Sequence, residues 1–269
     1  MRGTLKGRTI VKFRMGPKGV YLITGTKNIQ SVLRNSGSLS SNEMFYMALQ
    51  QLDGVTKEDI AKFKNDKSGR SHVPSNNVPD EDRIWAPNHR IFLDNLANTN
   101  AVGVMTNKFC ELFSETLSQR PAGQWQTARV FQFLEQEMAR CAIISLTGSY
   151  ILKENPDLID VMWKFDSNLY PLVFGVPRFL YSKPYAARDA FHEMGEKFLK
   201  AAWQKFDWTS RDATADWEPT FGTRFSRTHS KFLKDKGFAM RSRSGMFLGS
   251  MWAYVYFRSL LMPNANSVS

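Results

Sequence analysis

The stretch that decides the fold is Gly245-Met-Phe-Leu-Gly-Ser-Met-Trp-Ala-Tyr-Val-Tyr-Phe-Arg-Ser-Leu-Leu-Met262, because it is the one segment that suggests a membrane span. Arg258 interrupts it and leaves an apolar run of about 13 residues, whereas a helix that crosses a bilayer needs about 20. A shorter apolar helix is typical of the core of a folded domain. We therefore expect residues 245–262 to form a buried core helix.

Helical periodicity continues upstream of this stretch. Apolar residues recur at helical spacing in the segments 87–97, 102–117, 128–146, 157–174, 185–206 and 228–241. The breaks between them are rich in Pro, Gly, Asp or Ser and fall at 119–123, 148–156, 175–184 and 208–222. The alternation of strands and helices that builds a doubly wound sheet is missing, so we expect a mainly helical fold.

The N-terminal part differs and is predicted to form a small β-hairpin. Thr9-Ile-Val-Lys-Phe-Arg14 and Val20-Tyr-Leu-Ile-Thr24 are rich in β-branched and aromatic residues, and Met15-Gly-Pro-Lys-Gly19 between them supplies turn residues. A short helix follows, with Thr26 as its expected cap and its end at residues 35–37. Residues 69–82 are rich in Pro, Ser and Asn and predict a long loop.

The composition indicates a folded protein with a basic surface. Of the 269 residues 42% are apolar, and 36 Lys and Arg against 25 Asp and Glu give a net charge of +11. The positive electrostatic field of such a charge attracts nucleic acid, an anionic membrane or an acidic protein partner. The basic residues are spread along the chain without the stripe and interleaved aromatic residues of a nucleic-acid reader, so we expect an ordinary solvated surface and no nucleic acid as partner.

No metal or hydrolase motif is visible. Cys110 and Cys141 have no nearby His or third Cys, and we expect both to be reduced core residues. The four histidines are far apart, and a G-x-S-x-G elbow is missing. Glu137 and Arg140 form an E-x-x-R pair on a predicted helix, which we interpret as a structural ion pair.

Trp85, His89 and Arg90 are the candidate binding residues. They lie at the start of the helix that follows the polar loop, and an indole N–H, an imidazole and a guanidinium suit a carboxylate. The alternative is a solvent-facing first turn without a ligand. Pro87 fits a first helical turn and so places Trp85 outside the regular helix, which weakens the interpretation that Trp85 and His89 share a face.

Several motifs together resemble the cytochrome P-450 family in its fungal haem-thiolate branch. The most specific lie between residues 145 and 194: Ser145-Leu-Thr-Gly148, Glu154-Asn-Pro156, Trp163-Lys-Phe-Asp166, Phe174-Gly-Val-Pro-Arg178 and Tyr185-Ala-Ala-Arg-Asp189. The opening hairpin with Gly25-Thr-Lys-Asn-Ile29 resembles the family's first sheet and helix B. Glu218-Pro-Thr-Phe-Gly222, followed by Arg224 and Arg227, is similar to the segment before helix H. Leu248-Gly-Ser-Met-Trp-Ala253 and Asn264-Ala-Asn266 resemble the start of helix I in the branch that contains sterol hydroxylases and prostacyclin synthase.

The resemblance implies the N-terminal half of a cytochrome P-450, mainly α with a small N-terminal β-hairpin and truncated within helix I. It implies one partial domain over 1–269: the hairpin and helix B in 1–37, the B to C region and helix C in 38–98, helices D to H in 99–243, and the start of helix I in 244–269. Between Ala253 and Asn264 the chain is about eight residues longer than the family pattern. We interpret this as an insertion at about 254–262, such as a retained intron.

The resemblance also implies a site. Trp85, His89 and Arg90 would hold the propionates of haem b, and Asn266, with Asn264 as second candidate, would line the oxygen side of helix I. Residues 69–82 and 174–184 would cover the substrate. The family's later E-x-x-R and Phe-Gly-Cys loop follow the position of Ser269, so the axial Cys is missing here and we expect this chain to retain no haem and to be inactive alone.

The whole family member would insert one oxygen atom from O₂ into a lipophilic, sterol-like or secondary-metabolite substrate, with electrons from an NADPH-dependent reductase. We expect an intracellular protein; family members are usually anchored in the endoplasmic reticulum, and no anchor segment is visible here. The alternative is a non-catalytic helical module that binds a hydrophobic ligand or a protein, or a pseudogene product.

Overall fold

The computed structural model describes residues 10–15, 18–35, 40–74, 78–120, 123, 127 and 129–260. Its strands are β1 (Ile10–Met15), β2 (Lys18–Ile23), β3 (Trp217–Glu218) and β4 (Gly222–Thr223). Its α-helices are α1 (Thr26–Arg34), α2 (Asn42–Gln51), α3 (Lys57–Asn65), α4 (Trp85–Phe92), α5 (Thr99–Ser118), α6 (Val130–Thr147), α7 (Tyr150–Glu154), α8 (Leu158–Asp166), α9 (Leu169–Val173), α10 (Lys183–Lys205), α11 (Arg224–Asp235) and α12 (Met240–Leu260). Short 3-10 turns at Asp80–Asp82 and Arg211–Thr214 and a π-helical turn at Leu93–Ala97 complete the fold.

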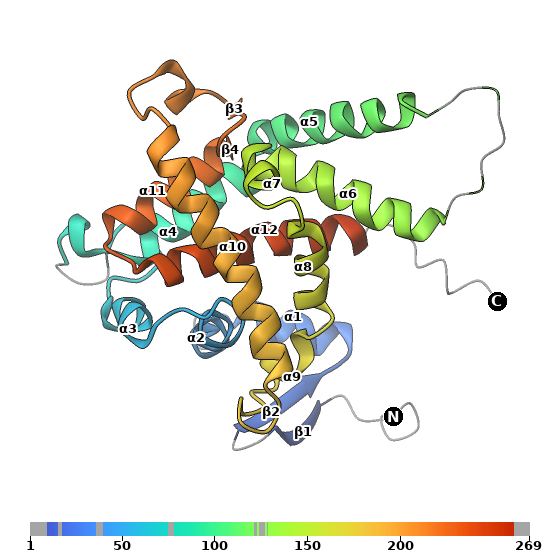
Figure 1. Ribbon diagram of the computed structural model, residues 1–269. Helices are drawn as coiled ribbons and strands as arrows, with labels where there is room; N and C mark the ends of the chain where they lie inside the picture. Colours follow the sequence, from blue (N-terminus) through green and yellow to red (C-terminus); the bar gives the residue numbers. More distant parts are fainter. Residues whose placement is uncertain are drawn as a thin grey trace.

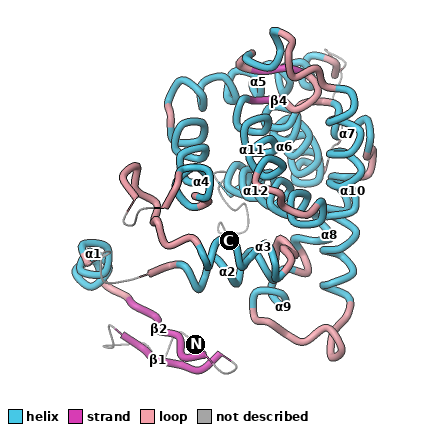
Figure 2. Tube along the Cα trace, turned by 90° about the vertical axis from the view of Figure 1, so that its left-hand side faces the viewer, coloured by secondary structure: helices cyan, strands magenta, loops and turns pink. Residues whose placement is uncertain are grey.

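The predicted hairpin of β1 and β2 is confirmed, and Figure 2 shows it apart from the helical body. Its antiparallel register pairs Ile10 with Ile23 and Phe13 with Val20. The expected cap at Thr26 is wrong, because Thr26 is already inside helix α1 and the N-cap is Gly25. Gly25 has a φ of 88°, a conformation that residues with a Cβ rarely adopt.

Most of the expected helices are confirmed, with four differences. Helix α7 lies within the segment 148–156, which was expected to be a break. The segment 157–174 is two helices, α8 and α9, with a break at Ser167 and Asn168. The segment 228–241 is likewise divided between α11 and the start of α12. Helices α2 and α3 were not predicted, although Thr56 gave a capping signal for α3: its side chain accepts a hydrogen bond from the Asp59 N–H at 3.2 Å.

Helix α12 forms the centre of the molecule and confirms the expected core helix (Figure 1). Five of its apolar side chains are at most 5% exposed, those of Met246, Phe247, Leu248, Met251 and Val255. Helices α6, α10 and α11 all pack against it. Within the described residues, no helix combines the length and apolar character that a membrane crossing requires.

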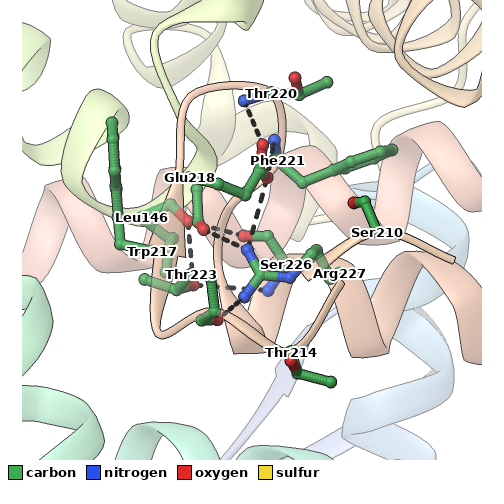
Figure 3. Close-up of polar contacts among 12 residues, drawn as sticks. Leu146, Ser210, Thr214, Trp217, Glu218, Thr220, Phe221, Thr223, Ser226 and Arg227 are labelled. Carbon is green, nitrogen blue, oxygen red and sulfur yellow. Dashed lines mark hydrogen bonds and ion pairs between the residues drawn. The ribbon is translucent and has the colours of Figure 1, made fainter. Parts of the chain in front are cut away.

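A second small sheet, β3–β4, closes the C-terminal end of α6 and was not predicted from sequence. The last carbonyls of a helix have no partner within the helix. Here the Trp217 indole N–H donates to the Ile144 and Ser145 oxygens at 3.2 and 3.1 Å. The Thr223 and Ser226 hydroxyls donate to the Leu146 oxygen at 3.0 and 2.8 Å (Figure 3). The sheet therefore caps α6 with side chains from far along the chain.

A buried ion pair organises the same hairpin (Figure 3). The Arg227 guanidinium lies 3.4 Å from the Glu218 carboxylate, and the two side chains are 2% and 4% exposed. Glu218 also accepts hydrogen bonds from the Thr220 and Phe221 N–H groups at 2.7 and 2.6 Å. A buried charge is tolerated when it is paired and fully hydrogen-bonded, and Glu218 meets that condition.

Gly148 and Gly222 let the β3–β4 turn lie directly against the end of α6. Both have positive φ, 83° and 74°, and a Cβ on Gly222 would overlap the Gly148 nitrogen and the Leu146 oxygen. We expect Gly222→Ala to lower the free energy of unfolding by at least about 2 kcal/mol, through backbone strain and the displaced turn. Denaturant unfolding followed by circular dichroism measures this change.

Gly103→Ala is the matched control. Gly103 lies inside helix α5 and has open space where a Cβ would be. Alanine should therefore stabilise the helix there, by up to about 1 kcal/mol. An equal loss of stability in both variants would contradict the role assigned to the Gly148–Gly222 contact.

Candidate functional site

Helix α4, which carries the candidate residues, is capped by a carboxylate from a distant segment. Asp66 Oδ2 accepts hydrogen bonds from the Ile84 and Trp85 N–H groups at 2.7 and 2.8 Å, and no adjacent side chain caps the helix. Burial tends to raise the pKa of Asp66, but hydrogen bonds from Ser68, Trp85 and Ile84 outweigh burial, so the pKa is lowered. The negative charge of Asp66 at the N-terminus of α4 also interacts favourably with the helix dipole.

Trp85 is a buried anchor of this helix. Its indole N–H donates to the Phe63 backbone oxygen at 2.8 Å, and its ring packs against Phe45 and Phe63 with centroids 4.9 and 5.1 Å away. The expectation that Pro87 leaves Trp85 outside the helix is wrong, because α4 begins at Trp85. Pro87 is tolerated two residues later because the first N–H groups of a helix have no intrahelical partner. The indole N–H is thus already in use.

His89 and Arg90 are both exposed and can meet a ligand. His89 lies one turn beyond Trp85 on the same face, and both line an open depression of about 450 Å³. Arg90 lines a neighbouring depression of about 290 Å³ and pairs with Asp94 at 2.7 Å, with 66% and 53% of the two side chains exposed. Such an exposed pair contributes little, so Arg90 can exchange partners at small cost.

Arg70 is a cation of this site that sequence reasoning missed. It lines both depressions together with His89, and its guanidinium carbon lies 4.4 Å from the centroid of the Trp85 ring. Its Nη2 also donates to Asn42 Oδ1 at 3.0 Å. Arg70 belongs to the expected loop 69–82, and nothing in its local sequence indicates that the loop folds back over α4.

The loop is held in place by Arg83, which is 5% exposed. The Arg83 guanidinium donates to Ser68 Oγ at 3.1 Å and to the backbone oxygens of His72 and Ser71 at 2.9 and 2.5 Å. Its hydrogen-bonding capacity is therefore used inside the protein. Arg83 positions the loop but leaves ligand contact to Arg70 and His89.

Apolar side chains and one unpartnered acceptor complete the larger depression. Met44, Phe45 and Phe92 line it beside Trp85. Asn88 also lines it; this residue is 7% exposed, and its Oδ1 has no hydrogen-bond partner among the described residues. The arrangement suits a flat apolar molecule with acidic groups at one edge.

The remaining sequence predictions have mixed outcomes. The Glu137–Arg140 ion pair is confirmed, with Nε and Oε2 2.7 Å apart. Cys141 is buried as expected, but Cys110 is exposed. Met105 and Phe109 form the buried face of α5, and Cys110, one residue later, is turned about 100° away from that face. Asn264 and Asn266 lie outside the described residues, whereas the interpreted insertion at 254–262 continues helix α12 as far as Leu260. Among the described residues, no three His, Cys, Asp or Glu side chains gather as a metal site.

Fold and site together define a mainly helical protein with a partly apolar, cation-rimmed depression. Comparison with known proteins gives its relatives. The chain is 39% identical over 221 residues to the cytochrome P450 monooxygenase calL of Penicillium decumbens, an alignment that covers 81% of this chain and 42% of that protein. It is 23% identical over 255 residues to the cytochrome P450 monooxygenase fsoE of Humicola fuscoatra, covering 92% of this chain and 40% of that protein.

The chain therefore belongs to the fungal cytochrome P450 family. It spans about two fifths of the length of these two relatives, and 31% of a third, the cytochrome P450 monooxygenase efuG of Hormonema carpetanum. No protein-family model and no solved structure matches it. The sequence-based recognition of the family is confirmed.

The cap of α4 predicts a pH-dependent stability. Because the pKa of Asp66 is lowered on folding, its contribution is present above the unfolded value near 3.8 and is lost as the pH falls through the folded pKa. We expect Asp66→Asn to lower the free energy of unfolding by about 1–3 kcal/mol at neutral pH. The loss should become smaller in acid, where the wild-type carboxyl is also protonated. Urea unfolding across the acid range measures it.

Asp82→Asn is the control for that series. Asp82 is exposed and lies in the short turn before α4. A surface change of this kind usually alters stability by less than about 0.5 kcal/mol. If Asp66→Asn behaved like Asp82→Asn, the cap would contribute nothing to the position of α4.

Proposed function

We propose that this chain is the N-terminal portion of a cytochrome P450 monooxygenase that inserts one oxygen atom from O₂ into a lipophilic substrate. The observation that carries the proposal is the 39% identity over 221 residues to a protein of that name. In this assignment residues 1–37 supply the first sheet and helix B, and 38–98 the B to C region and helix C. Residues 99–243 supply helices D to H, and 244–269 the start of helix I.

Haem b is the cofactor that the family implies, and it supplies the iron at which oxygen is activated. We assign His89 and Arg90 as donors to its propionates, with Arg70 as a further cation. A charge-assisted hydrogen bond to a carboxylate is stronger than a neutral one, and all three side chains are exposed. Trp85 serves as an apolar wall, since its N–H is bound to the Phe63 oxygen.

Neither cysteine of the chain suits the axial position. Burial raises the pKa of the Cys141 thiol, which opposes the thiolate that iron requires. Cys110 lies on the exposed side of α5 and lacks the glycines and phenylalanine of the family's ligand loop. We therefore propose that the 269-residue chain by itself retains no haem and does not catalyse the reaction.

The substrate side and the partners complete the proposal. Residues 69–82 and 174–184 would govern substrate entry, and Asn266 or Asn264 would lie near bound oxygen. The net charge of +11 would suit an acidic face of an NADPH-dependent reductase. The substrate would be sterol-like or a secondary metabolite.

A second candidate is a non-catalytic binding module. The depression of about 450 Å³ favours it, because apolar walls and exposed cations suit a hydrophobic acid without any iron. The unpartnered Asn88 oxygen would accept a hydrogen bond from a hydroxyl or N–H group of the same ligand. Absorption spectra of the reduced protein with carbon monoxide distinguish the two. The thiolate-haem signature is expected from the product of the complete gene and not from these 269 residues. A gene without a downstream Phe-Gly-Cys loop would favour the module.

In the complete protein, we expect His89→Ala and Arg70→Ala each to lower haem affinity about tenfold, because each removes the N–H donors of a charge-assisted hydrogen bond. Trp85→Phe should leave haem affinity nearly unchanged and lower stability by about 1 kcal/mol through the lost bond to Phe63. Haem transfer to apomyoglobin measures the affinity. Lys57→Gln, at the distant start of α3, is the control for lost surface charge. A tenfold effect of Trp85→Phe would show that its indole moves to a propionate.

A further inference from the structure

A second cavity lies between α4, α11 and the segment that follows α10, away from the His89 depression. It is open and measures about 520 Å³. Its lining residues are Ile91, Trp208, Ala213, Arg227, Thr228, Lys231, Phe232 and Asp235. None of these residues lines either depression at His89. The volume falls within the range of cavities that hold small organic ligands.

Two residues that line this cavity each carry a buried N–H donor without a partner among the described residues. Arg227 is 2% exposed; its Nη1 donates to the Gly222 oxygen at 2.6 Å, and its Nη2 donates to the Ala215 oxygen. Its Nε has no hydrogen-bond partner among the described residues, and neither has Trp208 Nε1. A buried donor left unsatisfied is costly, so two in one cavity indicate an acceptor that binds there.

The Trp208 side chain is held rigidly. Its ring stacks on Trp203 with centroids 4.3 Å apart and meets Phe206 edge to face at 4.8 Å. Rotation of the indole away from the cavity would break both contacts. Its N–H is therefore fixed in place before any ligand arrives, as a binding site requires.

The residues that line the cavity carry two cations, Arg227 and Lys231, and one carboxylate, Asp235, and this excess of positive charge favours an anionic acceptor. Glu218 is the partner of Arg227 but already accepts two backbone N–H bonds, so it leaves the guanidinium Nε free. Lys231 lines the cavity and pairs with Asp235 at 3.1 Å, where 57% and 56% of the two side chains are exposed. Such a pair is weak in water, and Lys231 can turn to a ligand.

We propose that this cavity binds a small organic carboxylate. One carboxylate oxygen accepts from Arg227 Nε and the other from Trp208 Nε1, with Lys231 adding positive charge at the mouth. The apolar body of the ligand lies against Ile91, Ala213 and Phe232. Guanidinium and indole donors in an apolar wall recognise this class, since a carboxylate carries two acceptor oxygens and its attached carbon skeleton needs no polar partner.

The test uses the 269-residue chain labelled with ¹⁵N and titrated with benzoate, with benzyl alcohol as the uncharged control. Spectra of the seven tryptophan indole N–H groups report binding, and Trp208→Phe identifies the Trp208 signal. We expect benzoate to shift that signal saturably and benzyl alcohol to leave it unmoved. In Trp208→Phe, which keeps an aromatic ring, benzoate affinity measured by calorimetry should fall about tenfold.

Lys231→Gln should weaken benzoate binding a few-fold, whereas Lys234→Gln is the matched control. Lys234 is one turn away, lies over the Trp203 ring at 3.7 Å and does not line the cavity. An unmoved Trp208 signal, an equal response to benzyl alcohol, or unchanged affinity in Trp208→Phe would each overturn the proposal. If Trp208→Phe fails to unfold cooperatively, the two lysine variants provide the test. Equal benzoate affinity in Lys231→Gln and Lys234→Gln would then overturn the proposal.

Discussion

The fold depends on the close approach of backbones to helix α12. A Cβ on Gly195 of α10 would overlap Ser244 and Leu248 of α12, and a Cβ on Gly245 would overlap the Asp53 carbonyl oxygen. Glycines at these two points bring α10 and the turn after α2 into direct contact with α12. The Ser244 hydroxyl then donates to the His192 backbone oxygen at 2.5 Å and joins the two helices. Larger side chains would separate the elements and open the core.

Two carboxylates accept hydrogen bonds from backbone N–H groups that have no other partner in this packing. Asp66 satisfies the first N–H groups of α4, and Glu218 satisfies two N–H groups of the β3–β4 turn while pairing with Arg227. Asp66 reaches α4 from a segment 18 residues before Ile84, whereas Glu218 serves the turn that directly follows it. The site at His89 is positioned in the same way, because the start of α4 is set by Asp66 and by the bond of Trp85 to Phe63.

The candidate site could be predicted only in part. Helical spacing placed Trp85 and His89 on one face, and both line the same depression. Spacing could not reveal that the Trp85 N–H is bound to Phe63, nor that Arg70 lies over its ring, since these contacts join segments separated by a loop. The cavity at Arg227 and Trp208 was likewise invisible, because its walls come from three separate parts of the chain.

The sequence by itself determined the class of fold, the N-terminal hairpin, the core position of residues 245–255 and the family. Local propensity, apolar periodicity and motif order are properties of contiguous residues, so they can be read without a structure. Tertiary structure alone decided the β3–β4 cap on α6, the exposure of Cys110 and the use of each buried donor. These features depend on which distant groups come into contact in the folded protein. A buried polar group without a partner costs free energy, so the fold must bring a partner to it from another part of the chain.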